Sequence, residues 1–166
     1  PANAMEIFVV GKQWMWKIQH PEGRREINEL HVPIGTPIKL KMTSEDVIHS
    51  FFIPAFRIKM DVLPGKYTSV WFTATEPGKY HLFCAEYCGT NHSGMIGYVT
   101  AMEPERYAEW LAQGIEASQQ NAEPISSQGA KLFQKYRCDT CHFSGSRGQG
   151  PDLIQLFESD VELSTG

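Results

Sequence analysis

Four residues of the kinds that bind soft metal ions lie between positions 84 and 95. Two thiols, an imidazole and a thioether fall within twelve residues, at Cys84, Cys88, His92 and Met95. Together these groups favour copper or zinc, and a Met beside His and Cys is typical of copper electron-transfer sites. A mononuclear site of that type needs a single Cys, so the second thiol indicates a pair of coppers bridged by sulfur. Such a pair needs another imidazole, and His49 is the best placed candidate upstream.

Two other chemistries fit part of this pattern. Two Cys four residues apart in an exported protein could form a disulfide, and two Cys with two His could close a structural zinc site. Neither accounts for Met95 or for the His-Ser-Phe-Phe-Ile-Pro segment that begins at His49. A copper carrier would expose its ligands on a mobile segment, whereas these ligands lie between predicted strands. Copper held in a rigid loop is therefore the favoured interpretation.

A second motif lies near the C-terminus. Cys138, Cys141 and His142 form the C-x-x-C-H signature of covalent haem c attachment. The two thiols would bond to the haem and His142 would ligate its iron, with a redox dithiol as the alternative. No Met that could be the distal ligand follows Met102, and the chain stops at Gly166, too soon to enclose a haem. We therefore expect a truncated cytochrome c segment in which haem c is absent or non-native.

The composition is that of an ordinary globular protein. The chain has 166 residues, 42% of them hydrophobic, and a net charge of -4 from 15 basic and 19 acidic residues. This modest, mixed charge argues against nucleic-acid binding. No apolar run reaches the ~18 residues of a membrane-spanning helix, and no signal peptide begins the chain. The four cysteines form two local pairs with a His nearby, which is cofactor spacing rather than a disulfide framework.

Short alternating or apolar segments, separated by Gly and Pro, predict about eight to ten strands. They cover residues 5–10, 13–19, 25–31, 37–43, 47–53, 67–75, 79–83 and 97–102. In the cleanest alternation Ile38, Leu40 and Met42 face inward, whereas residues 54–64 are predicted to be irregular. We expect an all-β, antiparallel Greek-key sandwich or barrel. The ligand loop would lie between its last two strands, with His49 at a neighbouring strand end.

The periodicity changes after position 103. Pro104 begins a predicted amphipathic helix that runs to about position 118. Residues 118–124 are polar and include a Pro, which indicates a linker, and residues 127–136 predict a further short helix. We therefore divide the chain into a β domain at residues 1–103, a helix and linker at 104–125, and the truncated cytochrome c segment at 126–166.

The ligand loop and the segment around His49 resemble the copper A site of cytochrome c oxidase subunit II. Within roughly the first two thirds of the chain, the sequence carries C-x-E-x-C-G-x-x-H-x-x-M, preceded by V-x-H-S-F-x-I-P. The resemblance implies a cupredoxin-like fold. Two thiolates would bridge the coppers, each copper would have one imidazole, and a Met sulfur and a main-chain carbonyl would be weak axial ligands. The implied ligands are His49, Cys84, Glu86 through its carbonyl, Cys88, His92 and Met95.

The same resemblance implies a path for electrons. Gln13-Trp14-Met15-Trp16 is similar to the family's aromatic signature, in which the first Trp admits electrons to the copper pair. Trp14 would have that role, with packing as the alternative for both tryptophans. The basic residues that follow, at Lys17, His20, Arg24 and Arg25, stand where better-known members carry acidic ones. A positive stretch would repel a free, basic cytochrome c, which favours a donor tethered to the chain.

Several other residues are assigned from their surroundings. Three histidines lack neighbouring soft ligands and are predicted to lie at the surface: His20, His31 and His81. Met60 has no neighbouring Cys or His and is predicted to pack against other residues rather than to bind metal. The resemblance places Arg57 and Asp61 near the haem-bearing subunit I. In the family the carboxylate of Glu86 helps bind magnesium at that contact, so we expect no magnesium in the isolated domain.

These features imply a function in respiration. The chain resembles subunit II of oxidases that carry their own cytochrome c. It would accept electrons from cytochrome c or another small redox donor and pass them to subunit I, where oxygen is reduced. We interpret it as a soluble piece of a membrane-anchored parent, located on the periplasmic or outer face of the membrane. The alternatives are the copper A domain of a nitrous oxide or nitric oxide reductase and, from another class, a copper carrier or structural zinc module.

Overall fold

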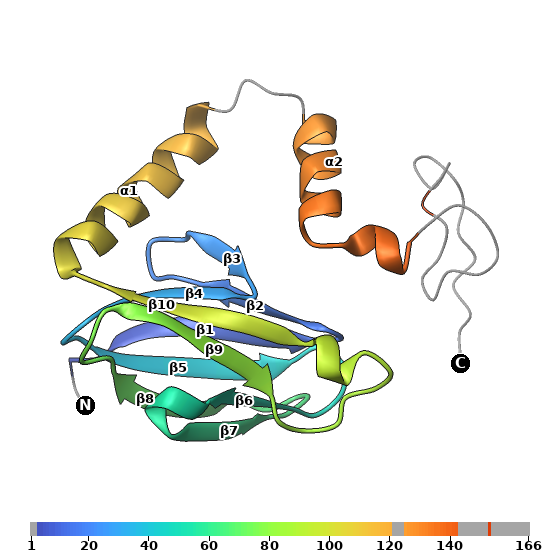
Figure 1. The fold of residues 1–166 in the computed structure, drawn as a ribbon, viewed down its shortest axis with the longest axis horizontal. Helices are drawn as coiled ribbons and strands as arrows, with labels where there is room; N and C mark the ends of the chain where they lie inside the picture. Colours follow the sequence, from blue (N-terminus) through green and yellow to red (C-terminus); the bar gives the residue numbers. More distant parts are fainter. Residues whose placement is uncertain (1–2, 121–124, 143–152, 154–166) are drawn as a thin grey trace. The chain divides into compact units, whose positions relative to one another are not determined.

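A computed structural model describes residues 3–120, 125–142 and 153 of the chain. By its contacts the chain forms two compact units, residues 1–119 and 120–166, and each is described by itself. The first unit contains two five-stranded sheets that pack face to face (Figure 1). The predicted all-β class is confirmed for this unit.

The first sheet has the order β3-β2-β1-β5-β8, and the second has the order β4-β10-β9-β6-β7. The strands of the first sheet are β1 (Met5–Lys12), β2 (Met15–Gln19), β3 (Arg25–Ile27), β5 (Pro37–Ser44) and β8 (Thr68–Thr73). Those of the second are β4 (Glu29–Pro33), β6 (His49–Ile53), β7 (Ile58–Val62), β9 (Gly78–Cys84) and β10 (Ile96–Met102).

The expectation of wholly antiparallel sheets was wrong at two pairs. Strands β1 and β5 are parallel, and so are β4 and β10. The reason lies at Asn28, where one predicted strand is broken into β3 and β4 by a left-handed residue with a φ of 58°. The Asn28 side chain accepts a hydrogen bond from Trp16 N at 2.8 Å, and its carbonyl accepts one from Tyr98 N at 2.9 Å. The chain thus leaves one sheet, joins the other, and returns as β5 in the same direction as β1.

Residues 54–64 are more regular than we predicted. A 3-10 helix, Pro54–Phe56, is followed by the edge strand β7. Arg57 adopts a φ of 54° between them, which turns the chain back so that β7 pairs with β6. In β7 the exposed Lys59 and Asp61 alternate with less exposed apolar residues, as is common on an edge strand with one face toward solvent.

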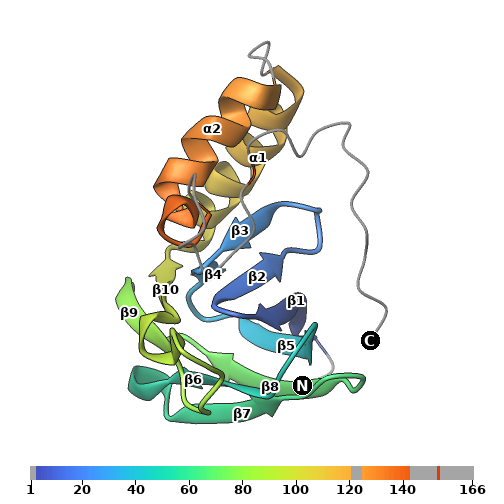
Figure 2. The same cartoon turned by 90° about the vertical axis from the view of Figure 1, so that its right-hand side faces the viewer.

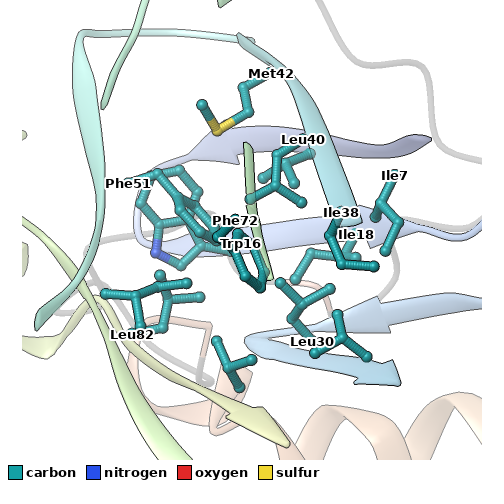
Figure 3. Packing of buried hydrophobic residues seen from close by; sticks show 14 of the residues in the cluster. Ile7, Trp16, Ile18, Leu30, Ile38, Leu40, Met42, Phe51, Phe72 and Leu82 are labelled. Atoms are coloured by element: carbon teal, nitrogen blue, oxygen red, sulfur yellow. The ribbon is translucent and has the colours of Figure 1, made fainter. Parts of the chain in front are cut away.

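Alternating apolar residues of both sheets form a single core. Ile38, Leu40 and Met42 are fully buried, as predicted. Met60 packs against the core, also as predicted. Figure 3 shows the largest of these side chains gathered in one cluster. The cluster includes Ile7, Trp16, Ile18, Leu30, Ile38, Leu40, Met42, Phe51, Phe72 and Leu82.

Helix α1 (Pro104–Gln120) packs on the β domain through a polar and aromatic cluster. The Arg24 guanidinium lies 3.6 Å from the ring centroid of Trp110 and donates a hydrogen bond to the Trp110 carbonyl. The Trp110 ring stacks on His31 with centroids 4.4 Å apart. His20 is only 1% exposed and contacts the Tyr107 hydroxyl at 3.0 Å. The prediction that His20 and His31 lie at the surface was therefore wrong, because α1 covers them, whereas His81 is exposed as predicted.

The carboxylate of Glu26 joins the two histidines of this cluster. It accepts hydrogen bonds from His20 Nε2 at 2.8 Å, from His31 Nδ1 at 2.5 Å and from the His31 backbone at 3.1 Å. Its side chain is 7% exposed. Burial works to raise the pKa of Glu26, but the hydrogen bonds from His20 and His31 outweigh it and hold the pKa below its ordinary value of 4.5. The ionised form of Glu26 therefore stabilises the folded chain.

This arrangement predicts how acid affects stability. A lowered folded pKa gives stabilisation that is fully present above the unfolded pKa and is lost as the pH falls through the folded pKa. We expect Glu26→Gln to lower the free energy of unfolding by about 1–3 kcal/mol at neutral pH. As the pH falls and Glu26 of the wild type becomes protonated, the difference in the free energy of unfolding between the two proteins should shrink. Urea unfolding of both proteins across the acid range measures it, and a difference that stays constant with pH would contradict the prediction.

The second unit begins with helix α2 (Ile125–Lys135), which is followed by a 3-10 turn, Cys138–Thr140. The predicted helix at residues 127–136 is thus present, but it begins two residues earlier and ends one residue earlier. None of the helices in the described residues combines the length and apolar character needed to cross a membrane.

Candidate metal centre

Three segments that are distant in the sequence meet at one end of the β domain. They are the turn between β1 and β2, the start of β6, and the loop between β9 and β10 (Figures 1 and 2). Strands β6 and β9 are antiparallel neighbours, with Phe51 opposite Cys84, so the start of β6 adjoins the end of β9. The loop is held at its base by a hydrogen bond from Cys84 N to Met95 O at 3.2 Å. Strands on both sides therefore hold the loop.

The two thiols are at the centre of this site. Cys84 Sγ and Cys88 Sγ lie 3.8 Å apart, and the two residues are 8% and 2% exposed. Each thiol has its own imidazole, because His49 Nδ1 lies 3.8 Å from Cys84 Sγ and His92 Nδ1 lies 3.5 Å from Cys88 Sγ. Ligand atoms of His49, Cys84 and Cys88 all lie within 4.8 Å of one another, close enough to hold a metal ion.

Two further donors complete the group. Met95, which is 1% exposed, places its Sδ 3.8 Å from Cys88 Sγ. The main-chain carbonyl of Glu86 lies 3.2 Å from Cys84 Sγ. All six residues predicted as ligands are thus brought together. The donors fall into two sets, each with one thiol, one imidazole and one weaker group, and this division fits soft metal ions.

The two thiols differ in their readiness to ionise. Burial opposes ionisation of Cys84, but contacts with His49 and with the backbone at Ser50 and Glu86 outweigh burial and lower the Cys84 pKa to about 6. Burial and the neighbouring Cys84 thiolate raise the Cys88 pKa to about 12. One thiolate is therefore readily formed, whereas the second requires another positive charge in the site. Binding of a cation by both sulfurs would release protons.

Asp46 is a functional residue that the sequence did not reveal. Its Oδ1 accepts a hydrogen bond from His49 Nε2 at 2.9 Å, which leaves His49 Nδ1 facing Cys84. Burial works to lower the pKa of His49, yet contacts with Cys84 and Asp46 raise it. Asp46 Oδ2 accepts a hydrogen bond from the backbone of Gln13 at 2.8 Å. A carboxylate that orients a metal-binding His is a common feature of metal sites, and its place three residues before His49 was the available signal.

The two tryptophans of the aromatic segment occupy different places. Trp14 is partly buried, and its Nε1 donates a hydrogen bond to the Cys88 carbonyl at 3.2 Å. Trp16 is fully buried in the core, with its ring centroid 5.8 Å from that of His49 and 5.0 Å from that of Phe51. The packing alternative is therefore confirmed for Trp16. Trp14 touches the ligand loop, and its role in electron transfer stays a prediction.

The basic stretch after Trp16 is less positive at the surface than we expected. Lys17 pairs with Glu45 at 2.8 Å, and Lys12 lies 3.4 Å from the same carboxylate. His20 is buried, and Arg24 packs on Trp110. Three of the four basic side chains thus have acidic or aromatic partners, whereas Arg25 is exposed, and repulsion of a basic cytochrome c stays a prediction.

The remaining predicted residues are Arg57 and Asp61 in the first unit and the C-x-x-C-H motif in the second unit. Arg57 ends the 3-10 helix before β7, and Asp61 on β7 accepts a hydrogen bond from Ser50 at 2.7 Å. In the second unit, Cys138 and Cys141 are half-buried free thiols, the first at the start of the 3-10 turn and the second directly after its end. The backbone N of His142 donates to the Cys138 carbonyl at 2.9 Å, so the motif is compact. Their assignment to haem attachment stays a prediction.

Comparison with known proteins gives a consistent picture. Residues 24–102 match the family model described as cytochrome c oxidase subunit II, periplasmic domain. The chain is 42% identical over 115 residues to cytochrome c oxidase subunit 2 of Synechocystis sp., an alignment that covers 69% of this chain and 35% of that protein. It is 32% identical over 163 residues to cytochrome c oxidase subunit 2 of Alkalihalophilus pseudofirmus, covering 96% of this chain and 47% of the relative. The chain thus spans less than half the length of these relatives.

Solved structures support the same relationship. The periplasmic domain of subunit II of cytochrome oxidase (CoxB) of Bradyrhizobium japonicum superposes with a TM-score of 0.67 at 29% identity, covering 70% of this chain and 96% of that domain. A mixed disulfide intermediate between a thioredoxin-like TlpA protein and CoxB superposes with a TM-score of 0.62 at 29% identity, covering 69% of this chain and 92% of that one. The cupredoxin-like fold that the resemblance implied is confirmed by the CoxB domain.

Proposed function

This chain belongs to the family of the periplasmic domain of cytochrome c oxidase subunit II, and from this premise we propose that it transfers electrons through a dinuclear copper A centre. The observation that carries the proposal is the convergence of four further donors on two buried thiols whose sulfurs lie 3.8 Å apart. Curated relatives are subunits of an oxidoreductase complex, and oxygen reduction itself would occur in another subunit.

We assign the donors to two copper ions. Cys84 and Cys88 would bridge both. His49 and the Glu86 carbonyl lie on the Cys84 side, and His92 and Met95 lie on the Cys88 side. When bound, the copper pair would supply a one-electron redox centre. A structural zinc site is disfavoured, because a tetrahedral Cys2His2 set has no use for a thioether and a carbonyl at the same sulfurs.

The protein contributes a dry and rigid ligand frame. Both thiols and Met95 are buried, so little water reaches the three sulfur donors. Asp46 fixes which nitrogen of His49 faces the sulfur, and Trp16 packs against the imidazole ring. The loop closes on itself through hydrogen bonds from His92 N to Gly89 O and from Met95 N to His92 O. A frame of this kind keeps ligand positions similar in both redox states, which favours fast electron transfer.

Trp14 is our candidate for the residue through which electrons reach the site. Its indole N–H bonds the carbonyl of Cys88, a proposed bridging ligand, so a short covalent and hydrogen-bonded path joins the aromatic ring to the sulfur. The proposed donor is cytochrome c or another small redox protein, and the proposed acceptor is subunit I of the oxidase. The mixed charge around Lys17 and Glu45 neither strongly attracts nor repels a basic donor.

We propose that the second unit carries the electron donor. The Alkalihalophilus relative aligns over 96% of this chain, which supports reading both units as one subunit 2 polypeptide. We propose that Cys138, Cys141 and His142 attach haem c there. The proposed boundaries are a copper domain at residues 1–103, a helix and linker at 104–125, and a cytochrome c segment at 126–166. The proposed location is the outer, periplasmic face of a membrane.

A thioredoxin-like protein is a further candidate partner. CoxB forms a mixed disulfide with such a protein. Here Cys84 and Cys88 are free thiols 3.8 Å apart, close enough to form a disulfide after modest movement. Oxidation of this pair would remove both bridging thiolates, so a partner that keeps the thiols reduced would be needed before copper binds.

Electron paramagnetic resonance of the copper-loaded, oxidised chain tests the proposal, with copper and zinc content measured on the same sample. We expect two coppers per chain and a hyperfine pattern from one unpaired electron shared equally by both. A spectrum from a single isolated copper would contradict the bridging assignment. A silent sample that contains zinc would overturn the electron-transfer proposal altogether.

A further inference from the structure

The side chain and backbone of Gln13 connect the two segments that supply the metal donors. Its Nε2 donates a hydrogen bond to the Cys88 carbonyl at 2.7 Å. Its backbone N donates to Asp46 Oδ2 at 2.8 Å, and Asp46 Oδ1 in turn bonds His49. Gln13 therefore contacts the thiol-bearing loop on one side and the carboxylate that orients an imidazole on the other. These contacts bridge sequence separations of 75 and 33 residues.

The loop is shaped to receive the Gln13 amide. Gly89, directly after Cys88, has a φ of 113°, a conformation that L residues rarely adopt. A Cβ built on Gly89 would lie 2.8 Å from Gln13 Nε2 and 3.3 Å from the Trp14 ring. The missing side chain at position 89 thus leaves the space in which the amide reaches the carbonyl.

The bond from Gln13 also decides which backbone oxygen is free to face the metal. The Cys88 carbonyl accepts hydrogen bonds from both Gln13 Nε2 and Trp14 Nε1, at 2.7 and 3.2 Å. Both ordinary acceptor positions of that oxygen are therefore occupied. The Glu86 carbonyl, in contrast, points to within 3.2 Å of Cys84 Sγ.

We infer that Gln13 is a positioning residue that holds the Cys88 half of the loop against the His49 segment and keeps the Cys88 carbonyl turned away from the metal. This role concerns the proposed copper site, and the inference rests on that proposed function. The hydrogen bonds that define this role join protein atoms only, so its test need not involve copper.

Amide hydrogen exchange of the reduced, metal-free chain tests the inference. The informative amides are those of His92, Gly94 and Met95, which bond to Gly89, Asn91 and His92 within the loop. The variant Gln13→Leu keeps the backbone bond to Asp46 but removes the amide donor. Loss of one buried hydrogen bond predicts exchange about five- to tenfold faster at these three amides. The variant Gln13→Glu, which is isosteric but places an anion at the carbonyl, should have at least the same effect.

Gln19→Leu is the matched control, because Gln19 lies exposed on the same strand pair and the substitution is identical. It should leave exchange in the loop unchanged. The amide of Leu40 in the core of β5 reports global opening. Unchanged loop exchange in both Gln13 variants would overturn the inference. An equal rise in the exchange rate of the Leu40 amide would also overturn it, because the substitution would then destabilise the whole fold rather than the loop. Since no copper is present, either failure is distinct from a failure of the copper A proposal, which the spectrum decides.

Discussion

A Cys88→Ser variant is expected to bind at most one copper per chain, and its rate of electron transfer should fall by more than about 100-fold. Residues that only support a metal ligand already change metal affinity by about 10- to 100-fold, so the loss of a proposed ligand should have a larger effect. Cys88 Sγ is the sulfur that contacts Cys84 Sγ, His92 Nδ1 and Met95 Sδ, at 3.8, 3.5 and 3.8 Å. Serine keeps the size of the side chain but removes the soft ligand. The His92 side of the site would then lose its bridge to the His49 side.

Copper content and reduction by a small donor, measured by stopped-flow absorbance, check this expectation. Cys141→Ser is the matched control, because Cys141 is a free thiol in the second unit and the chemical change is the same. It should leave two coppers in the first unit. If Cys88→Ser retained two coppers with a shared electron, Cys88 would not be a bridging ligand.

A Trp16→Ala variant is expected to lower the free energy of unfolding by about 3–5 kcal/mol. Trp16 is fully buried and packs edge-on against both Phe51 and His49. The loss arises from packing alone, because among the described residues the Trp16 Nε1 is a buried nitrogen without a hydrogen-bond partner. Trp16→Phe should therefore recover most of the stability, since it gives up no hydrogen bond.

Urea unfolding of the metal-free chain measures these differences. Trp71→Ala is the control for size, because Trp71 is 59% exposed on β8. A surface change of this kind should alter stability by no more than about 0.5 kcal/mol. Equal losses for Trp16→Ala and Trp71→Ala would show that the core is not organised around Trp16.

That the six proposed ligands lie together was predictable, because five of the six are local in the sequence. The spacing from Cys84 to Met95 brings them into one short loop, and Gly89 supplies its unusual backbone. His49 was predictable from the segment around it. Strand positions were also predictable from local sequence, because the alternation of apolar and polar residues in β5 reflects the burial of one face of the strand.

The supporting contacts could not be predicted in the same way. Asp46 and Gln13 are ordinary polar residues, and only the fold shows that one orients His49 and the other bonds the Cys88 carbonyl. The burial of His20 and His31 depends on where α1 packs, which periodicity within α1 does not specify. The parallel pairing of β1 with β5 likewise depends on a change of sheet at Asn28 rather than on any pattern within the strands.

The compact loop between β9 and β10 also affects the order in which the site assembles. Closing a loop as short as Cys84 to Met95 costs little chain entropy, so most of the donors can meet before distant strands pair. His49 is the exception, 35 residues from Cys84, and it joins only when β6 lies beside β9. An unfolded chain would therefore retain appreciable affinity for the metal. Ligands that also bind the unfolded state stabilise the fold less than their native affinity suggests. Copper should thus raise the unfolding temperature of this domain less than it would if its ligands came from distant strands.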